Sequence, residues 1–390
     1  MRALVVLGLV PFHSALVFDT RDDFYVKNDV TVDLTGAAAG FVVVWAMPLL
    51  FAVAGLAAAH SVRRRGPGGF VRERLLRLGV PLVAATVLLT PVPQWLRARG
   101  AGHPDGALAY PEFWRRFFDV HLDWGGVPFV LRGRWFELGH LWFVALLLVG
   151  SFVVAAVAAW PGYARRVQGA TAWVAARPGA VLLPAVAVGA ACAPRLEEGF
   201  AAGNRWAYVL TFVAGFVLLA DDGVRAAVRR DRARALLVGG VAFAAAGVVL
   251  LAVDDAFVAP TLVAAVGRAA FGAAGWCFVV AILGRLDRGA GAGRDGTAGA
   301  PSGTGRGERA GPWWRRVLAR DGDLIMPFYV LHQPVVVVLA YAVVRTDLPA
   351  VVKFLALVTA SLVVTVVLAL AARRTAVSRL LLGMRVRSRG

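Results

Sequence analysis

The sequence predicts an all-α integral membrane protein that crosses the bilayer many times. Of its 390 residues, 59% are hydrophobic, whereas soluble domains contain roughly 45–50% apolar residues. The mean hydropathy is +0.69, and charged residues, 17% of the chain, cluster between long apolar runs. Several runs reach the roughly 20 residues that a helix needs to span the hydrocarbon core. These observations favour a single polytopic membrane domain over residues 1–390 rather than several soluble domains.

The apolar runs predict about ten transmembrane helices, whose ends are defined to within a few residues. In chain order they cover residues 3–18, 35–60, 75–96, 138–159, 179–195, 205–220, 235–253, 257–284, 323–344 and 349–372. The first run is short and follows Arg2, as in a signal peptide. It lacks an Ala-x-Ala-like cleavage site, however, and His13 interrupts its apolar residues. We therefore interpret it as a retained first helix.

The basic residues predict the orientation of these helices. The chain has 42 Lys and Arg residues and a formal net charge of +18. With the N-terminus inside, roughly two thirds of the Lys and Arg residues fall in inside segments, as the positive-inside rule requires. Both termini are therefore expected in the cytoplasm. No nucleic-acid-binding motif accompanies the charge, so we expect no nucleic-acid partner.

Two segments between the spans differ from ordinary loops. Residues 289–311 are rich in Gly, Ala and Arg without an apolar period, which predicts a flexible cytoplasmic linker. The outside segment 97–137 carries several Phe and Trp residues among charges. This composition is unlike that of a disordered loop and is typical of an amphipathic lid on the outer membrane face.

Polar side chains within membrane spans are costly and need a reason. His13 lies deep in the first helix, and Arg2 precedes it by eleven residues. In an α-helix this separation brings both side chains to one face, about 16 Å apart along the axis. The geometry suits a reagent whose anionic part meets Arg2 and whose reacting part meets His13. The alternative also stays open: Arg2 is then a membrane anchor, and His13 a hydrogen-bonded core residue.

A second basic cluster stands where the third span begins. It consists of Arg72, Arg74 and Arg77, and the last two are i,i+3 neighbours on a helix. Guanidinium groups can grip phosphate oxygens through paired hydrogen bonds. The cluster is therefore a candidate anion-binding site, with a plain cytoplasmic anchor as the alternative.

Two further pairs place ionisable side chains near one another. Glu137 and His140 are i,i+3 neighbours at the outer start of the fourth span. Tyr329 and His332 share a face of the ninth span, whose Pro334 predicts a kink. Each histidine is open to a catalytic and to a structural interpretation.

Other features exclude competing kinds of site. Arg268 lies within the eighth span, where we expect its long side chain to snorkel outward, with a functional role as the alternative. Cys192 and Cys277 lie in apolar segments and predict neither a disulfide nor a metal site. No Gly-x-Ser-x-Gly, P-loop or His-Glu-x-x-His motif occurs, and the histidines lack metal-ligand spacing, so we expect no metal.

Four segments, in this order, resemble acyltransferase family 3, whose members are polytopic membrane O-acyltransferases. They are Arg2 to Ser14, Phe70 to Pro81, Gly139 to Phe143 and Tyr329 to Pro334. The resemblance runs from about residue 2 to residue 372. The Pro-Phe-His-Ser motif resembles the corresponding sequence in the subgroup that includes glucans biosynthesis protein C. Family members usually carry a few residues before the first arginine, which leaves open whether the native start lies upstream of Met1.

The resemblance implies transfer of an acyl group of the acetyl or succinyl class from cytoplasmic acyl-CoA to a hydroxyl of an extracytoplasmic glycan. It places the protein in a bacterial inner or plasma membrane. It implies that His13 is the catalytic histidine and that Arg2, Arg72, Arg74 and Arg77 hold the donor. Candidate supporting or acceptor-side residues are Glu137, His140, Trp142, Tyr329 and His332.

The expected chemistry is general-base catalysis. A neutral imidazole can take the proton of a sugar hydroxyl as its oxygen attacks the thioester, and burial favours the neutral ring. Direct transfer and a ping-pong route through acyl-histidine both stay open. Acyl-CoA is expected as a co-substrate, with no bound cofactor. The alternative is a multi-pass transporter or flippase for a polar lipid or sugar, which leaves the shared face of Arg2 and His13 without explanation.

Overall fold

The computed structural model describes residues 2–20, 24–33, 36–201, 203–291 and 323–385. Helices make up nearly all of the regular structure there, and the named strands form one two-stranded sheet. The predicted all-α class is confirmed. The expected linker at 289–311 lies outside the described residues from residue 292 on. The organisation as a single domain over residues 1–390 stays a prediction.

Two compact units make up the chain, and each has its own core. The first contains Met1–Gly36, Arg74–Ala145 and Ala310–Gly390, and the second contains Ala37–Glu73 and Leu146–Arg309. Two helices, α2 (Gly36–Arg74) and α6 (Trp142–Ala159), have residues in both units.

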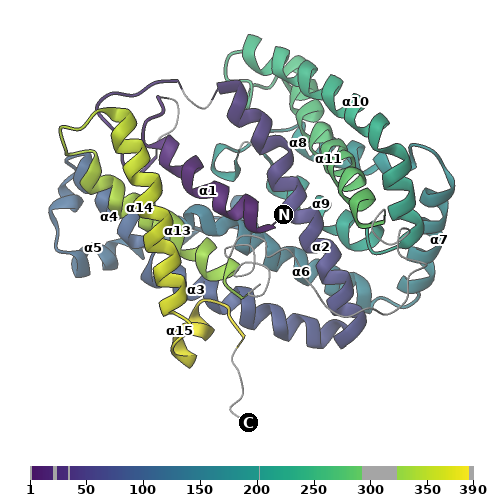
Figure 1. Cartoon of the computed structure of the whole chain (residues 1–390), viewed down its shortest axis with the longest axis horizontal. Coiled ribbons are helices and arrows are strands. Elements are labelled where there is room, and N and C mark those ends of the chain that lie inside the picture. Colours follow the sequence, from purple (N-terminus) through teal and green to yellow (C-terminus); the bar gives the residue numbers. More distant parts are fainter. Residues whose placement is uncertain (1, 21–23, 34–35, 202, 292–322, 386–390) are drawn as a thin grey trace, which may run out of the picture. The chain divides into compact units, whose positions relative to one another are not determined.

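The first unit is a helical bundle around α13 (Ile325–Val343), which Figure 1 shows beside α1 and α14. Its other elements are α1 (Arg2–Leu16), η1 (Leu75–Gly79), α3 (Val80–Leu88), α4 (Pro91–Gly100), η2 (Pro104–Ala107), α5 (Tyr110–Phe117), β1 (Val120–Leu122), η3 (Trp124–Gly126), β2 (Leu131–Gly133), η4 (Gly139–Leu141), α14 (Ala350–Ala371) and α15 (Ala376–Leu381). Helices α1, α4 and α14 all pack against α13. Nearly every residue of α13 from Pro327 to Val337 is buried, which accounts for its apolar sequence on all sides.

Two lysines hold the ends of the helices in this bundle. Lys353, near the start of α14, is buried and donates to the Val344 carbonyl (2.9 Å) and to Asn28 Oδ1 (3.2 Å). Val344 ends α13, so the ammonium group lies at the negative end of that helix dipole. Lys27 donates to the Leu16 carbonyl at the end of α1 (2.8 Å). These contacts tie the loop after α1 to the connection between α13 and α14.

The aromatic segment 97–137 is a folded structure with its own small core. Phe113 and Phe117 on α5 are fully buried. The Trp114 indole N–H donates to the Val87 carbonyl of α3 (2.9 Å) and so attaches α5 to the helical bundle. Strands β1 and β2 pair antiparallel beyond α5. The predicted order of this segment is confirmed, whereas its place on the outer membrane face stays a prediction.

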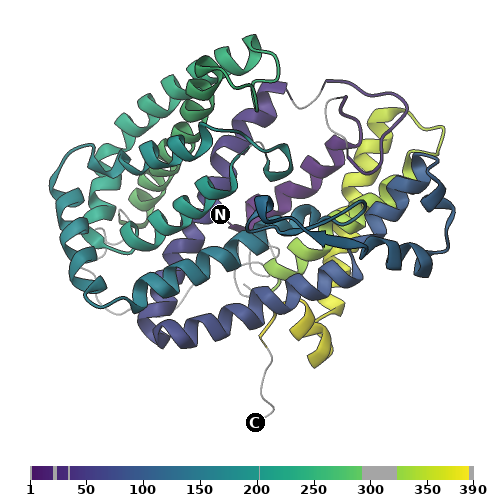
Figure 2. The ribbon, with the colours of Figure 1, turned by 180° about the vertical axis from the view of Figure 1, so that it is seen from behind.

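The second unit is built from closely packed helices (Figure 2). Besides most of α2 and α6 it contains α7 (Tyr163–Ala176), η5 (Ala180–Leu182), α8 (Pro184–Cys192), η6 (Glu198–Phe200), α9 (Arg205–Leu218), α10 (Asp222–Ala252) and α11 (Leu262–Gly291). Glycines bring α2 and α9 into backbone contact. A Cβ on Gly55 would lie 2.0 Å from the Phe212 carbonyl oxygen, and one on Gly215 would lie 2.2 Å from the Ala52 carbonyl oxygen. Small residues at helix crossings are typical of packing within membranes.

Arg268 in α11 does not snorkel outward, so that expectation is wrong. It is 2% exposed. Its guanidinium donates to the carbonyl oxygens of Ala193 (2.8 Å), Ala256 (2.7 Å) and Ala259 (3.0 Å). These carbonyls follow α8 and lie in the turn before α11, where backbone acceptors lack helical partners. Arg268 therefore satisfies backbone carbonyls at the end of α8 and in the turn before α11 from inside the unit, which is a structural role.

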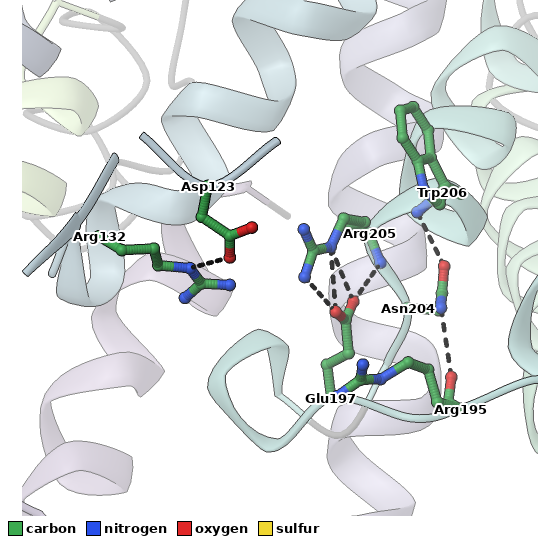
Figure 3. Close-up of polar contacts among 7 residues, drawn as sticks. All are labelled: Asp123, Arg132, Arg195, Glu197, Asn204, Arg205 and Trp206. Atoms are coloured by element: carbon green, nitrogen blue, oxygen red, sulfur yellow. Dashed lines mark hydrogen bonds and ion pairs between the residues drawn. The ribbon is translucent and has the colours of Figure 1, made fainter. Parts of the chain in front are cut away.

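A second network of polar contacts orders the turn before α9 (Figure 3). Arg205 donates to the Glu197 carboxylate from its backbone N–H (3.1 Å) and from its guanidinium Nε (3.0 Å). Asn204 accepts the backbone N–H of Trp206 (2.9 Å) and donates to the Arg195 carbonyl (3.2 Å). Asn204 is thus the N-cap of α9. The turn is held by polar contacts because it has no apolar run of its own.

Six stretches in the described part of the chain are helical, long and apolar enough to cross a membrane. They are Gly40–Gly100, Gly139–Ala159, Asp222–Ala252, Leu262–Asp287, Ile325–Val343 and Ala350–Ala371. The first of them contains both the second and the third expected span, which separate at Gly66, where the backbone turns left-handed (φ 70°). Three shorter apolar helices are Val5–Leu16, Ala180–Cys192 and Arg205–Leu218. Multiple crossings are therefore supported, and the number ten and the cytoplasmic termini stay predictions.

Candidate active site

Three histidines from three separate elements meet inside the first unit. They are His13 of α1, His140 of η4 and His332 of α13. The His332 ring lies between the other two, with its centroid 5.3 Å from that of His13 and 5.0 Å from that of His140. The sequence singled out each of them, but it paired none with another. The bundle packing of α1 and η4 against α13 brings them together.

The hydrogen bond of His332 fixes which of its nitrogens carries the proton. The ring is fully buried, and its Nδ1 lies 2.5 Å from the Tyr329 carbonyl oxygen one turn earlier. A carbonyl only accepts, so Nδ1 is the donor, and in the neutral ring Nε2 keeps a lone pair. Nε2 is buried and has no hydrogen-bond partner among the described residues. His332 thus presents an unused acceptor to the cluster.

His13 also has an unused buried nitrogen. Its Nδ1 has no hydrogen-bond partner in the described part of the chain, although part of the ring is exposed. The ring stacks on Phe24 at 5.9 Å, and the hydroxyl of the neighbouring Ser14 is likewise buried without a described partner. Buried polar groups in proteins are nearly always hydrogen-bonded. The hydrogen bond that a core histidine would make is therefore not found at Nδ1 among the described residues, and a functional role for His13 stays a prediction.

Hydrogen bonds to backbone carbonyls position His140 through its Nε2 and Tyr329 through its hydroxyl. His140 Nε2 donates to the Val330 carbonyl of α13 (3.1 Å). In return, the Tyr329 hydroxyl donates to the backbone carbonyl of His140. The shared helix face predicted for Tyr329 and His332 is confirmed. This reciprocal pair fastens η4 to α13, and the supporting or acceptor-side roles of His140 and Tyr329 stay predictions.

Glu137 lies outside the helix in which the sequence placed it. Gly139 has a φ of 50°, and α6 begins only at Trp142, so Glu137 and His140 do not form a helical i,i+3 pair. The Tyr25 hydroxyl donates to the Glu137 carboxylate. Burial raises the pKa of Glu137, and this bond with Tyr25 is the largest effect that opposes the rise. A Cβ on Gly139 would lie 2.8 Å from the Tyr25 hydroxyl, which accounts for a glycine here.

Arg74 and Arg77 lie at a π-helical turn of the first unit. Leu75–Gly79 is a π-helix that follows Arg74 directly, so the two arginines lie on one continuous helix whose turn is wider than that of an α-helix. Such turns are frequent at functional sites. The Arg77 guanidinium donates to Asp323 Oδ1 at 3.1 Å, and the Arg385 guanidinium lies 3.9 Å from the same oxygen. The guanidinium of Arg77, which the sequence predicts to bind an anionic ligand, is therefore paired with the carboxylate of Asp323.

The other two arginines are placed less closely. Arg2 begins α1, and α1 is one continuous helix as far as His13, as the spacing argument requires. The side chain of Arg2 lies outside the described part of the structure. Arg72 is exposed near the end of α2, within the second unit. Trp142 is partly buried at the start of α6, beside Phe143.

Three features of the site carried no signal in the sequence. Tyr25 and Phe24 come from the loop after α1, where neither periodicity nor charge singles them out. Gln333, which lies near Gly139, is 5% exposed and follows His332 within an apolar helix.

Among the described residues, no group of three His, Cys, Asp or Glu side chains is placed to hold a metal ion.

Comparison with known proteins gives one match. A family model described as an acyltransferase domain matches residues 1–374. No curated protein and no solved structure gives a significant match. The matched region contains every residue of the candidate site.

Proposed function

The chain belongs to acyltransferase family 3, and from this premise we propose that it moves an acyl group from cytoplasmic acyl-CoA to a hydroxyl of an extracytoplasmic carbohydrate. It is a membrane acyltransferase by family and by its several long apolar helices. We further propose that the transferred acyl group is of the acetyl or succinyl class and that the protein lies in a bacterial plasma membrane. We also keep the glucans biosynthesis protein C-like subgroup as the nearest in sequence.

One observation carries the proposal: the rings of His13 and His332 lie 5.3 Å apart, centroid to centroid, and each has a buried nitrogen without a hydrogen-bond partner among the described residues. A neutral His13 takes the proton of the acceptor hydroxyl as that oxygen attacks the thioester carbonyl. The carbon–sulfur bond then breaks, and the thiolate of CoA leaves and takes the proton from the His13 imidazolium. The other nitrogen of His13 carries the N–H of the neutral ring, and the lone pair on His332 Nε2 can accept it and so stabilise the imidazolium that forms.

The donor side of the proposal rests on the basic residues at the cytoplasmic end. CoA carries a pyrophosphate and a 3′-phosphate, and guanidinium groups bind phosphate oxygens in pairs. Arg77 pairs with a carboxylate, that of Asp323. A phosphate can replace that carboxylate. We assign Arg74 and Arg77 to the donor, with Arg2 and Arg72 as the further candidates from the sequence.

The direct test of the function is acyl-CoA-dependent acylation of a glycan. Membranes that contain the protein are expected to add the acyl mass to cell-envelope glycans and to release free CoA thiol in equal amount. Mass spectrometry and a thiol assay measure the two products, and membranes without the protein are the control. Glycan transport without any gain of acyl mass would instead support a transporter or flippase.

The Arg77→Ala variant is expected to raise the KM for acyl-CoA about tenfold or more, because hydrogen bonds to charged groups contribute about 1.5–3 kcal/mol. Steady-state kinetics at saturating acceptor measures this change. Asp323→Asn is the matched control, since it removes the same ion pair but keeps the guanidinium. If the two variants behave alike, Arg77 has only a structural role.

A further inference from the structure

A polar groove lies on the folded segment 97–137 of the first unit, away from the histidine cluster. It has a volume of about 290 Å³, near the lower end of the roughly 300–1,000 Å³ of ligand pockets. Its lining residues are Asp105, Arg116, Asp119, His121, Gly133, Arg134 and Trp135. They come from η2, from α5 and the turn after it, and from the β1–β2 hairpin with the residues that follow it.

Local folding explains how these residues come to surround one space. Strand β1 places His121 opposite Arg132 of β2, and Val120 opposite Gly133. A Cβ on Gly133 would lie 2.6 Å from the Asp119 carbonyl oxygen, so only glycine allows the backbone at residue 133 to approach the backbone at residue 119 this closely. The hairpin therefore holds the end of α5 and the start of β1 beside the residues that follow β2.

Part of the groove is fixed and part is available. The Trp135 indole N–H donates to Asp105 Oδ2 (2.8 Å). The Arg134 guanidinium lies 2.6 Å from His103 Nε2. These contacts fix the orientation of the charged side chains of Asp105 and Arg134. Three side chains make no hydrogen bond or ion pair with any described residue and are exposed. They are Arg116, Asp119 and His121. These three can bind a ligand without losing a protein contact.

The charges of the groove indicate the chemical class of its ligand. Two carboxylates and two guanidinium groups line it, so it offers acceptors and donors in balance. An anion would meet Asp105 and Asp119, and a cation would meet Arg116 and Arg134. A neutral ligand with many hydroxyls can donate to the carboxylates and accept from the guanidinium groups at once. That description fits an uncharged sugar unit.

The chain connects the groove to the histidine cluster over a short distance. Trp135 lines the groove, and Glu137 and His140 follow it on the same strand of chain. Five residues span at most about 18 Å. All of these residues belong to one compact unit. A bound oligosaccharide is therefore long enough to reach from the groove to the part of the unit that holds the histidine cluster.

We propose that this groove binds a neutral sugar unit of the acceptor, next to the unit whose hydroxyl is acylated. The inference rests on the proposed acyltransferase function and adds where the acceptor is held and which chemistry recognises it. Arg116 and Asp119 are the residues that make the new contacts. They bind substrate and take no part in the proton transfer.

The test uses the full-length protein in membranes, with neutral and acidic oligosaccharide fractions of the host cell envelope as separate acceptors. Arg116→Gln and Asp119→Asn are each expected to raise the KM for the neutral fraction about tenfold, because each loses hydrogen bonds to a charged group. The kcat and the KM for acyl-CoA stay unchanged. Asp123→Asn is the matched control, because Asp123 lies in the same segment outside the groove, where it faces Arg132.

The outcomes separate this inference from the proposed function. No acyl transfer by the wild-type protein to either fraction would refute the proposed function itself. Acyl transfer by the wild type with an unchanged acceptor KM in both groove variants would refute only the groove. Transfer confined to the acidic fraction, with the same KM effects, would overturn the neutral class of the ligand.

Discussion

Replacing His13 with alanine is expected to lower the rate of acyl transfer by a factor of about 10²–10⁴, the usual contribution of a general base. His13 lies on α1 with an orphan Nδ1 beside His332. Removal of the ring leaves the acceptor hydroxyl without a base. Mass spectrometry of envelope glycans, with protein levels measured in parallel, gives the result.

The glutamine variant separates catalysis from packing at this position. His13→Gln keeps a side chain of similar reach that can hydrogen-bond, but its amide cannot take a proton at useful pH. It is therefore expected to fail like alanine. A core histidine would behave differently, since glutamine would keep most activity and any loss would follow lost stability. Near-normal acylation by a well-folded His13→Ala protein would contradict the mechanism.

The sequence predicted those features of the site that depend on one helix at a time. The shared face of Tyr329 and His332 follows from helical periodicity, and the structure bears it out. The continuous helix from Arg2 to His13 follows in the same way. Local apolar content also predicted the all-α class, because a membrane span is defined by its own residues.

Features that need long-range contacts could not be predicted. The His140 ring is held by the Val330 carbonyl, 190 residues away along the chain, and no periodicity reports such a contact. The left-handed turn at Gly139, which removes Glu137 from the helix, depends on the close approach of Tyr25. Arg268 was misjudged for the same reason.

The Arg268 case shows the physical cause. A long basic side chain in a span snorkels when its nearest polar partners are at the membrane surface. Here the carbonyls of Ala193 and Ala256 supply partners inside the unit. Whether such carbonyls are present is decided by how α8 ends and how the turn before α11 folds, not by the sequence around residue 268.

The second large effect is expected at His332. Its Nδ1–H is used on the Tyr329 carbonyl, and its Nε2 lone pair is buried without a described partner next to His13. Leaving a polar group unsatisfied costs about 1–3 kcal/mol. An N–H of His13 can donate to this lone pair, and such a bond is stronger once His13 has taken the proton, because hydrogen bonds from charged donors are stronger than neutral ones. His332 thus stabilises the charged state that forms during reaction more than the resting state.

Two variants test this role against a purely structural one. His332→Asn can keep a donor near the position of Nδ1 for the Tyr329 carbonyl but has no atom at Nε2. It is expected to lower kcat about ten- to a hundredfold with little change in either KM, which matches one hydrogen bond to a charged group. His332→Gln carries an amide oxygen that can reach the Nε2 position and accept the imidazolium N–H, so it is expected to recover part of the activity. Steady-state kinetics, with thermal unfolding of each variant as the control, gives the answer. Wild-type kcat in His332→Asn would overturn the role, as would equal losses in both variants that simply follow lowered thermal stability.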